Sequence, residues 1–158
     1  MRKRNSSALL SVHAIAGTEV VLLAETQGND DPVIVIGDLN DSTLSVTTQM
    51  IAGDQPFFKL SSEAKKPARD VLLYTAQQIQ ARESTRDTYF THIFNGSYEA
   101  LDQVMVSQEF YGRNPDRRGE VDYVQVYNDH LLDEMQSHDD IPKTRSDHGQ
   151  VMVKIRVK

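Results

Sequence analysis

The 158-residue chain contains no cysteine. The absence of thiols excludes a disulfide-rich secreted scaffold, a structural zinc site built from cysteines and a cysteine nucleophile. A chain of this length needs no such cross-link, because a fold of about 150 residues buries roughly 68–70% of the surface that its unfolded chain exposes. We therefore expect residues 1–158 to form a single domain around one hydrophobic core.

Long apolar runs are also absent. No stretch approaches the roughly 20 apolar residues of a transmembrane helix, so we expect a soluble protein without a membrane partner, in a compartment that the sequence leaves open. Only the N-terminus resembles a targeting segment, because Arg2–Arg4 precede an apolar stretch and an A-x-A pattern at 14–16. Ser11 and His13 interrupt that stretch, which favours an amphipathic opening helix that the apolar run at 20–24 continues.

The chain lacks an excess of basic residues. It has 17 Lys and Arg against 23 Asp and Glu, a formal net charge of −6. This balance argues against a protein held to nucleic acid mainly by bulk charge. It leaves open a phosphate-cleaving site, because such sites gather carboxylates around a divalent metal ion that supplies the positive charge.

Apolar patterns and turn residues in the first half predict alternating helices and strands. Val33–Ile36 is an unbroken β-branched run between a turn at 28–32 and Gly37, and predicts a strand buried on both faces. Residues 42–50 predict a short helix, and the segment from 53 to 67 a loop. Pro67 is expected to open a helix that reaches Ile79, because proline is tolerated in the first helical turn.

The second half predicts antiparallel strands. Asn95-Gly96 separates strand-like runs at 88–94 and 98–106 and is a strong hairpin signal, because both residues tolerate positive φ. A two-residue turn there sets His92 opposite Glu99 and Tyr89 opposite Asp102. Further strands are predicted at 121–127 and at 151–157, the latter with Val151, Val153, Ile155 and Val157 on one face. The fold class is therefore α/β, with a mixed, mostly antiparallel sheet packed with helices.

Two loops beside the predicted strands concentrate acidic, amide and imidazole groups. Asp38 and Asn40 follow the strand at 33–36, and Asp147 and His148 precede the last strand. Positions just outside strand ends are where α/β proteins build their sites. A carboxylate binds Mg²⁺ or accepts a proton from water, and an imidazole donates to a phosphate when a carboxylate holds its other nitrogen. The alternative for Asp38 and Asn40 is a turn that caps a following helix.

Three segments together resemble a known family. Val35–Asn40, Leu101–Ser107 and Ser146–His148 are similar, in order, to the three C-terminal motifs of the endonuclease/exonuclease/phosphatase superfamily. The resemblance extends from about Val33 to Val157. It implies a Mg²⁺- or Mn²⁺-dependent phosphoesterase, a nuclease or phosphatase, acting on a phosphate ester or a nucleic acid. It also implies a fold equal to about half of a four-layer α/β sandwich.

The resemblance assigns a role to each candidate residue. Asp38 would orient or deprotonate the attacking water and contact the metal, and Asn40 would hold the scissile phosphate. Asp102 would orient His148, which would contact the phosphate and stabilise charge in the transition state, while Asp147 would be a metal ligand or lie beside one. The residues give independent support for one pair: Asp102 lies in an otherwise apolar strand, where an unpaired carboxylate is costly, and His148 is its best candidate partner.

The chain also departs from the family's pattern. The family's N-terminal half supplies an Asn, a Glu that is the principal metal ligand and a further His, and no such motif is visible among the 37 residues before Asp38. Gln103 replaces the aromatic residue that commonly follows the aspartate of the second motif. We therefore expect a C-terminal portion of the family's fold, weakly active or inactive by itself, that holds its metal weakly.

The remaining candidates have two interpretations each. Arg113, Arg117 and Arg118 form a basic cluster that could grip a substrate's phosphates, or a solvated loop partly neutralised by its acidic neighbours. His92 is a possible substrate or metal contact, although a cross-strand pair with Glu99 is favoured. For the whole chain, the alternative to an enzyme is a non-catalytic binding or assembly module. In either case we expect a homo-oligomer in which a second copy covers an apolar sheet face at 151–157.

Overall fold

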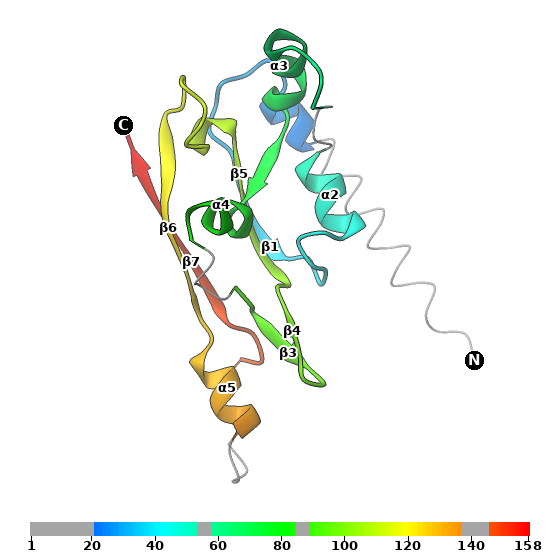
Figure 1. The fold of residues 1–158 in the computed structure, drawn as a ribbon, viewed down its shortest axis with the longest axis vertical. Helices are drawn as coiled ribbons and strands as arrows, with labels where there is room; N and C mark the ends of the chain where they lie inside the picture. The colour runs from blue at the N-terminus through cyan, green and yellow to red at the C-terminus, as the bar shows by residue number, and fades with distance from the viewer. Residues whose placement is uncertain (1–20, 54–57, 85–88, 137–145) are drawn as a thin grey trace, which may run out of the picture.

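The computed structural model describes residues 21–53, 58–84, 89–136 and 146–158 (Figure 1). The signal-like segment and most of the expected opening helix lie outside these residues, but residues 21–26 are helical, as expected for the continuation of that helix. Within the described ranges, no helix combines the length and the apolar character needed to cross a membrane.

The predicted α/β class is confirmed. The helices are α2 (Val46–Ala52), α3 (Ser62–Asp70), α4 (Ala76–Glu83) and α5 (Asp129–Gln136), and a 3₁₀ turn lies at Gln108–Phe110. The strands are β1 (Ile34–Asp38), β2 (Leu73–Thr75), β3 (His92–Phe94), β4 (Ser97–Glu99), β5 (Asp102–Ser107), β6 (Gly119–Tyr127) and β7 (Gln150–Val157). All pairings between them are antiparallel, and they form three separate sheets, β1-β5-β2, β3-β4 and β6-β7, in place of the one mixed sheet expected.

Strand β5 occupies the middle of the three-stranded sheet and contributes to a core on each face. Val104 and Val106 pack with Ile79 of α4 and Val124 of β6 in the first core. Met105 points to the opposite face and packs with residues of α2 and β2 in the second core. The strand alternates in this way because successive side chains point to opposite faces of a sheet. Figure 1 accordingly shows β6 and β7 on one side of this sheet and α2 on the other.

The helix predicted from Pro67 to Ile79 is wrong. Helix α3 begins at Ser62, with the Ser61 side chain accepting a hydrogen bond from the Ala64 amide, so Pro67 lies inside it. Strand β2 follows, and α4 then begins with Thr75 as its N-cap. The reason is visible in the burial of consecutive side chains: Tyr74 faces the first core and Leu73 the second, an alternation of period two that a helix does not provide.

Strand β1 is correctly predicted, but not its burial on both faces. Val35 and Leu39 pack against the second core. Ile34 and Ile36 point to the opposite face and are 42% and 74% exposed. They remain exposed because β1 is an edge strand, and β7 covers that face of the sheet over β5.

The apolar face of β7 is largely buried within the chain, whereas the prediction was an exposed face covered by a second copy. Val151, Val153 and Ile155 pack against the first core, and only Val157 of the predicted face is largely exposed. These residues therefore cannot form the free surface that a second copy was expected to cover. Ile34 and Ile36 of β1, by contrast, do expose apolar surface.

The hairpin prediction is confirmed. Asn95 and Gly96 have φ angles of 48° and 79°, and His92 pairs with Glu99 across β3 and β4. The pairing does not continue to Tyr89 and Asp102 as expected, because β5 pairs with β1 and β2. Tyr89 reaches Asp102 in another way, by donating its hydroxyl to the Asp102 carbonyl oxygen at 3.1 Å.

Candidate functional site

Three of the predicted residues meet at one end of the three-stranded sheet. Asp38, the last residue of β1, is the register partner of Asp102, the first residue of β5. Directly paired residues of antiparallel strands point to the same face, so both carboxylates lie on the side of the sheet that β7 covers. His148 lies just before β7. A ligand atom of each of the three side chains lies within 4.8 Å of the others.

The shortest contact of the site joins His148 to Asp102. The Nδ1 atom of His148 lies 2.7 Å from the Asp102 Oδ2 atom, with both side chains about a quarter exposed. The carboxylate fixes the imidazole orientation and leaves Nε2 as the nitrogen free for another partner. The predicted Asp102–His148 pair is therefore present in the structure.

Thr91, which sequence reasoning missed, holds both halves of this pair. Its side chain is fully buried, and its hydroxyl oxygen accepts hydrogen bonds from the backbone amides of Leu101 at 3.0 Å and Asp102 at 3.1 Å. Its carbonyl oxygen accepts from the Gly149 amide at 2.7 Å. One threonine thus connects the start of β5 to the His148 loop. Nothing in the local sequence distinguishes it from an ordinary strand threonine.

The surroundings of His148 favour its charged form. The hydrogen bond with Asp102 raises the pKa of His148 above its usual value, and the partial burial of the ring opposes this rise. The negative charges of Asp102, Asp38 and Asp147 raise the pKa further. An imidazolium held in this way can donate a hydrogen bond to an anion and neutralise part of its charge.

Asp38 and Asn40 form a tight turn at the end of β1. The Asn40 backbone amide donates to Asp38 Oδ1 at 2.8 Å, and its side-chain amide lies 3.4 Å from Asp38 Oδ2. Asn40 has a φ of 51°, so the sharp bend occurs there and not at Gly37, which lies within β1. The two residues do not cap the following helix, because α2 is capped by Ser45. Both side chains are exposed, with polar atoms available to a ligand.

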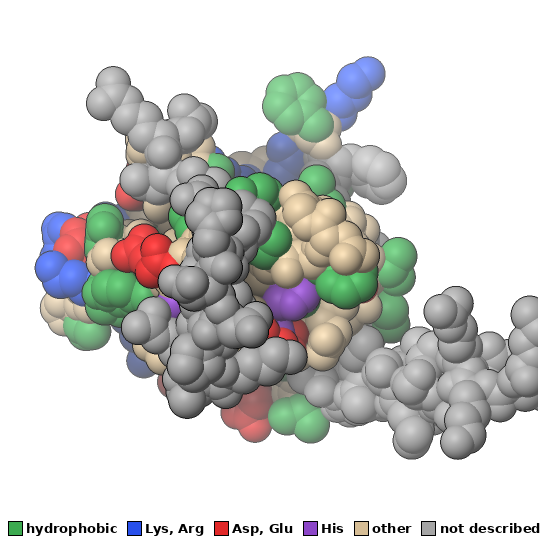
Figure 2. All heavy atoms as spheres, turned by 90° about the horizontal axis from the view of Figure 1, so that it is seen from below, with side chains coloured by type: hydrophobic (Ala, Val, Ile, Leu, Met, Phe, Trp, Pro, Cys, Tyr) green, Lys and Arg blue, Asp and Glu red, His purple; other side chains and the backbone are tan. Residues whose placement is uncertain are grey.

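His92 and Asp147 also lie close to His148. One ligand atom from each of His92, Asp147 and His148 lies within 4.8 Å of the others, and the two imidazole rings are 5.0 Å apart. His92 also has the predicted cross-strand partner, since its Nδ1 atom lies 3.7 Å from Glu99 Oε2. Figure 2, which views the molecule from this end, shows histidine and acidic side chains together at the surface.

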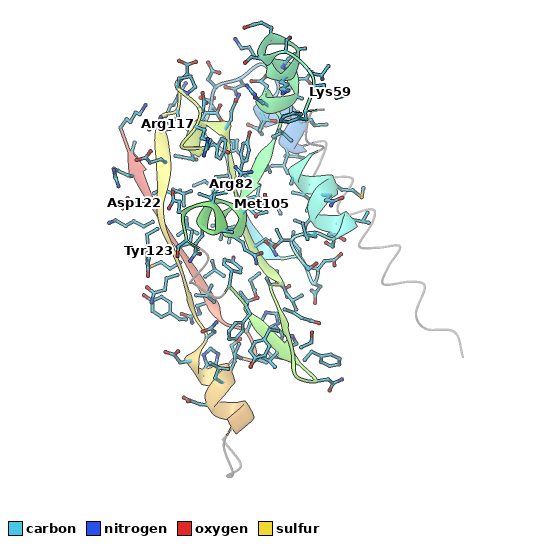
Figure 3. The ribbon with its side chains drawn as sticks, viewed as in Figure 1. Lys59, Arg82, Met105, Arg117, Asp122 and Tyr123 are labelled. Atoms are coloured by element: carbon cyan, nitrogen blue, oxygen red, sulfur yellow. The ribbon has the colours of Figure 1, made fainter. Side chains whose placement is uncertain are left out.

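The three arginines lie at the opposite end of the sheet. The six residues of β5 separate them from Asp102, which corresponds to about 20 Å of strand. Arg117, labelled in Figure 3 near the start of β6, contacts Glu120 at 3.0 Å, and Arg118 lies 3.7 Å from Asp31. The structure therefore does not bring this cluster to His148.

Arg113 lines a groove of about 770 Å³ between α3, α4 and the loop after β5. The groove contains the stacked rings of Tyr74 and Tyr111, 4.0 Å apart, and Arg82, which donates a hydrogen bond to the Tyr111 hydroxyl. None of the predicted catalytic residues lines this groove.

Gln103, which differs from the second motif of the family that the sequence resembles, points away from the site. It is 2% exposed, and its side-chain amide donates to the Ala100 carbonyl oxygen at 2.6 Å. It lies on the face of β5 opposite to Asp102 and Val104, since neighbouring strand residues alternate. Gln103 therefore does not interfere with the Asp102–His148 contact.

Comparison with known proteins gives no relative for this chain: no family model, no curated protein and no solved structure matches it.

Proposed function

We propose that the chain carries the reaction centre of a metal-dependent phosphoesterase, with Asp38, Asn40, Asp102 and His148 as its working residues. The observation that supports this most strongly is the 2.7 Å contact between His148 and Asp102 beside a second carboxylate, Asp38. The four side chains come from three segments far apart in the sequence. The resemblance to the endonuclease/exonuclease/phosphatase superfamily implies roles for these four residues that require them to lie close together, as they do.

The chemistry of the proposed reaction follows from the donors and acceptors. The Asp38 carboxylate accepts the proton of a water molecule as its oxygen attacks phosphorus, and the phosphorus–oxygen bond to the leaving group breaks. The His148 imidazolium, which Asp102 orients and whose pKa Asp102 raises, donates to a phosphoryl oxygen where negative charge develops. The exposed Asn40 amide donates to the same phosphate without adding charge.

The side chains present fit a weak Mg²⁺ or Mn²⁺ site. Mg²⁺ in proteins usually keeps several waters and takes one or two carboxylates together with substrate phosphate oxygens. Asp38 and Asp147 are exposed carboxylates near His148, and neither is held by it as Asp102 is. They would hold the ion, and the ion would supply positive charge to the phosphate.

A phosphodiester hydrolysis assay with a chromogenic diester tests the proposal. We expect Mg²⁺- or Mn²⁺-dependent activity that falls by about 100-fold or more in the Asp38→Ala and His148→Ala variants, as for loss of an acid–base group. Asp116→Asn removes an exposed carboxylate from the arginine loop, the loop that carries Arg113, Arg117 and Arg118. This variant should retain the activity. Absence of metal-dependent activity in the unmodified chain, or equal activity in all variants, would refute the proposal.

The remote arginines restrict the class of substrate that they can contact. A single phosphate ester at His148 cannot reach Arg113 along about 20 Å of strand, whereas a nucleic-acid strand can. If the substrate is a nucleic acid, Arg113→Ala should weaken cleavage of an oligonucleotide and leave cleavage of the small diester unchanged. Equal effects on both substrates would exclude this role for Arg113.

A second candidate function, assembly with another copy of the chain, is favoured by a separate observation. Ile34 and Ile36 expose apolar surface on β1, which is an edge strand with a single hydrogen-bonded neighbour among the described strands. Exposed apolar edges of this kind pair readily with other strands. Analytical ultracentrifugation of the purified chain tests this function independently of any catalytic assay.

A further inference from the structure

We propose that His92, His148 and Asp147 form a binding site for a transition-metal ion of the Zn²⁺ type. The three side chains provide two imidazoles and one carboxylate, with a ligand atom of each within 4.8 Å of the others. This donor set differs from the oxygen ligands that suit Mg²⁺, because imidazole favours zinc and its neighbours in the first transition row. The proposed zinc site therefore differs from the proposed Mg²⁺ site in its nitrogen ligands and does not include Asp38.

A carboxylate lies beside the same nitrogen of both imidazole rings, and it hydrogen-bonds to that nitrogen in His148. Asp102 Oδ2 lies 2.7 Å from Nδ1 of His148, and Glu99 Oε2 lies 3.7 Å from Nδ1 of His92. Metal-binding histidines commonly donate one N–H to a carboxylate, which fixes the tautomer and increases the basicity of the other nitrogen. The arrangement leaves Nε2 of each ring for a common metal ion.

The state of His92 is a second observation that points to a ligand. Its Nδ1 atom is buried and has no hydrogen-bond partner among the described residues. A small rotation that brings this nitrogen within hydrogen-bond distance of Glu99 would satisfy it, and binding of a metal at the other nitrogen favours that arrangement. The two rings, 5.0 Å apart and inclined by 36°, are close enough to share one ion.

The three donor atoms need to move only slightly closer together to bind zinc in a tetrahedral arrangement. Zinc–nitrogen bonds of about 2.0–2.1 Å imply donor atoms roughly 3.3 Å apart in a tetrahedron. The donors now lie within 4.8 Å of one another, and Asp147 is exposed and can rotate. Three protein ligands leave a fourth position for water, as in open zinc sites.

The proposed zinc site shares His148 with the reaction centre and Asp147 with the proposed Mg²⁺ site. If His148 binds zinc through Nε2, the same nitrogen cannot donate to a phosphate, so zinc and a phosphate ester compete. This competition rests on the proposed function, whereas zinc binding does not. A zinc titration without substrate therefore tests the metal site even if the chain has no phosphoesterase activity.

Isothermal titration of the untagged chain with Zn²⁺ provides the test. We expect one ion per chain, with an affinity at least tenfold lower in His92→Ala and in Asp147→Ala. His130→Ala is the matched control, because His130 lies near His148, with its Nε2 atom 3.2 Å from the His148 carbonyl oxygen, but does not belong to the three-residue cluster. This variant should bind zinc as the unmodified chain does.

A second measurement uses only the unmodified chain, so it tests the site even if a variant fails to fold. In NMR spectra of the unmodified chain, Zn²⁺ should shift the imidazole signals of His92 and His148, and a large excess of Mg²⁺ should not reproduce the shift of His92. The affinity should also fall as the pH drops, because an imidazole binds a metal ion only in its neutral form. Unshifted signals of His92, or equal affinity in His92→Ala and the unmodified chain, would overturn the proposal.

Discussion

At the scale of single residues, the Asp102–His148 contact organises the site. Asp102 begins a strand whose next residues are buried, and an unpaired carboxylate there would lose hydration without compensation. His148 compensates by direct contact at 2.7 Å, and the Thr91 hydroxyl holds the backbone amide of Asp102. The pair is therefore required both by the packing of β5 and by the proposed chemistry.

The first prediction concerns the pKa of His148. We expect NMR titration to give a pKa above the usual value near 6.5, and Asp102→Asn to lower it, because the hydrogen bond to Asp102 is the largest cause of the rise. The pKa of His148 is raised in the folded state, so protonated His148 stabilises that state. This stabilisation is fully present below about pH 6.5 and is lost as the pH rises through the folded-state pKa. The difference in unfolding free energy between Asp102→Asn and the unmodified chain should shrink over that range.

Asp116→Asn serves as the control in the same titration. This carboxylate is exposed and lies in the arginine loop, at the other end of β5. Its removal should leave the His148 titration unchanged. An unaltered His148 pKa in Asp102→Asn would contradict the assignment of the rise to Asp102.

The second prediction concerns Thr91. Thr91→Val keeps the shape of the side chain but leaves the partly buried amides of Leu101 and Asp102 without their acceptor. We expect the free energy of unfolding, measured by urea denaturation, to fall by about 1–3 kcal/mol, the usual cost of an unsatisfied buried group. Thr91→Ser retains the hydroxyl and should recover most of this loss. If both variants were equally stable, the hydroxyl would have no structural role.

At the scale of helices and strands, the accuracy of the sequence predictions followed the range of the interactions that determine each element. The hairpin at Asn95-Gly96 was correctly predicted because positive φ at two adjacent residues is a local requirement. Strand β2 was missed, since its three residues are stabilised by pairing with β5 and not by their own pattern. The site was predicted in part: Asp38, Asp102 and His148 follow recognisable motifs, whereas Thr91 acts through backbone contacts that leave no sequence signal.

The third prediction concerns the close contact between β6 and β7. A Cβ atom at Gly119 would lie 2.7 Å from the Arg156 carbonyl oxygen and 3.1 Å from the Phe110 ring, so Gly119→Ala forces the strands apart. We expect a loss of about 1–3 kcal/mol in the free energy of unfolding. Gly37→Ala, in β1, meets no atom within 4 Å and should change stability little. Equal stability of the two variants, measured by urea denaturation, would show that the β6–β7 spacing adjusts freely.

At the scale of the whole molecule, the exposed surface of β1 is continuous with the proposed reaction centre. Ile34 and Ile36 point to the same face of the sheet as Asp38, because alternate residues of a strand share a face. Along the same strand, an apolar surface thus leads directly to the carboxylate. A polypeptide that covered the two isoleucines would also enclose Asp38, and would strengthen its electrostatic interactions by excluding water.

The last prediction is that this surface joins two copies of the chain. A two-fold axis beside β1 would pair the edge strands antiparallel, extend each three-stranded sheet into one sheet of both copies and bring each Ile36 against its neighbour. We expect sedimentation velocity to detect a dimer that Ile36→Lys converts to a monomer, because two charges cannot be buried side by side without partners. Val157→Lys is the matched control, since Val157 is 72% exposed and Ile36 is 74% exposed, but Val157 lies on β7. This control should leave the dimer intact, and a monomeric unmodified chain at micromolar concentration would refute assembly through β1.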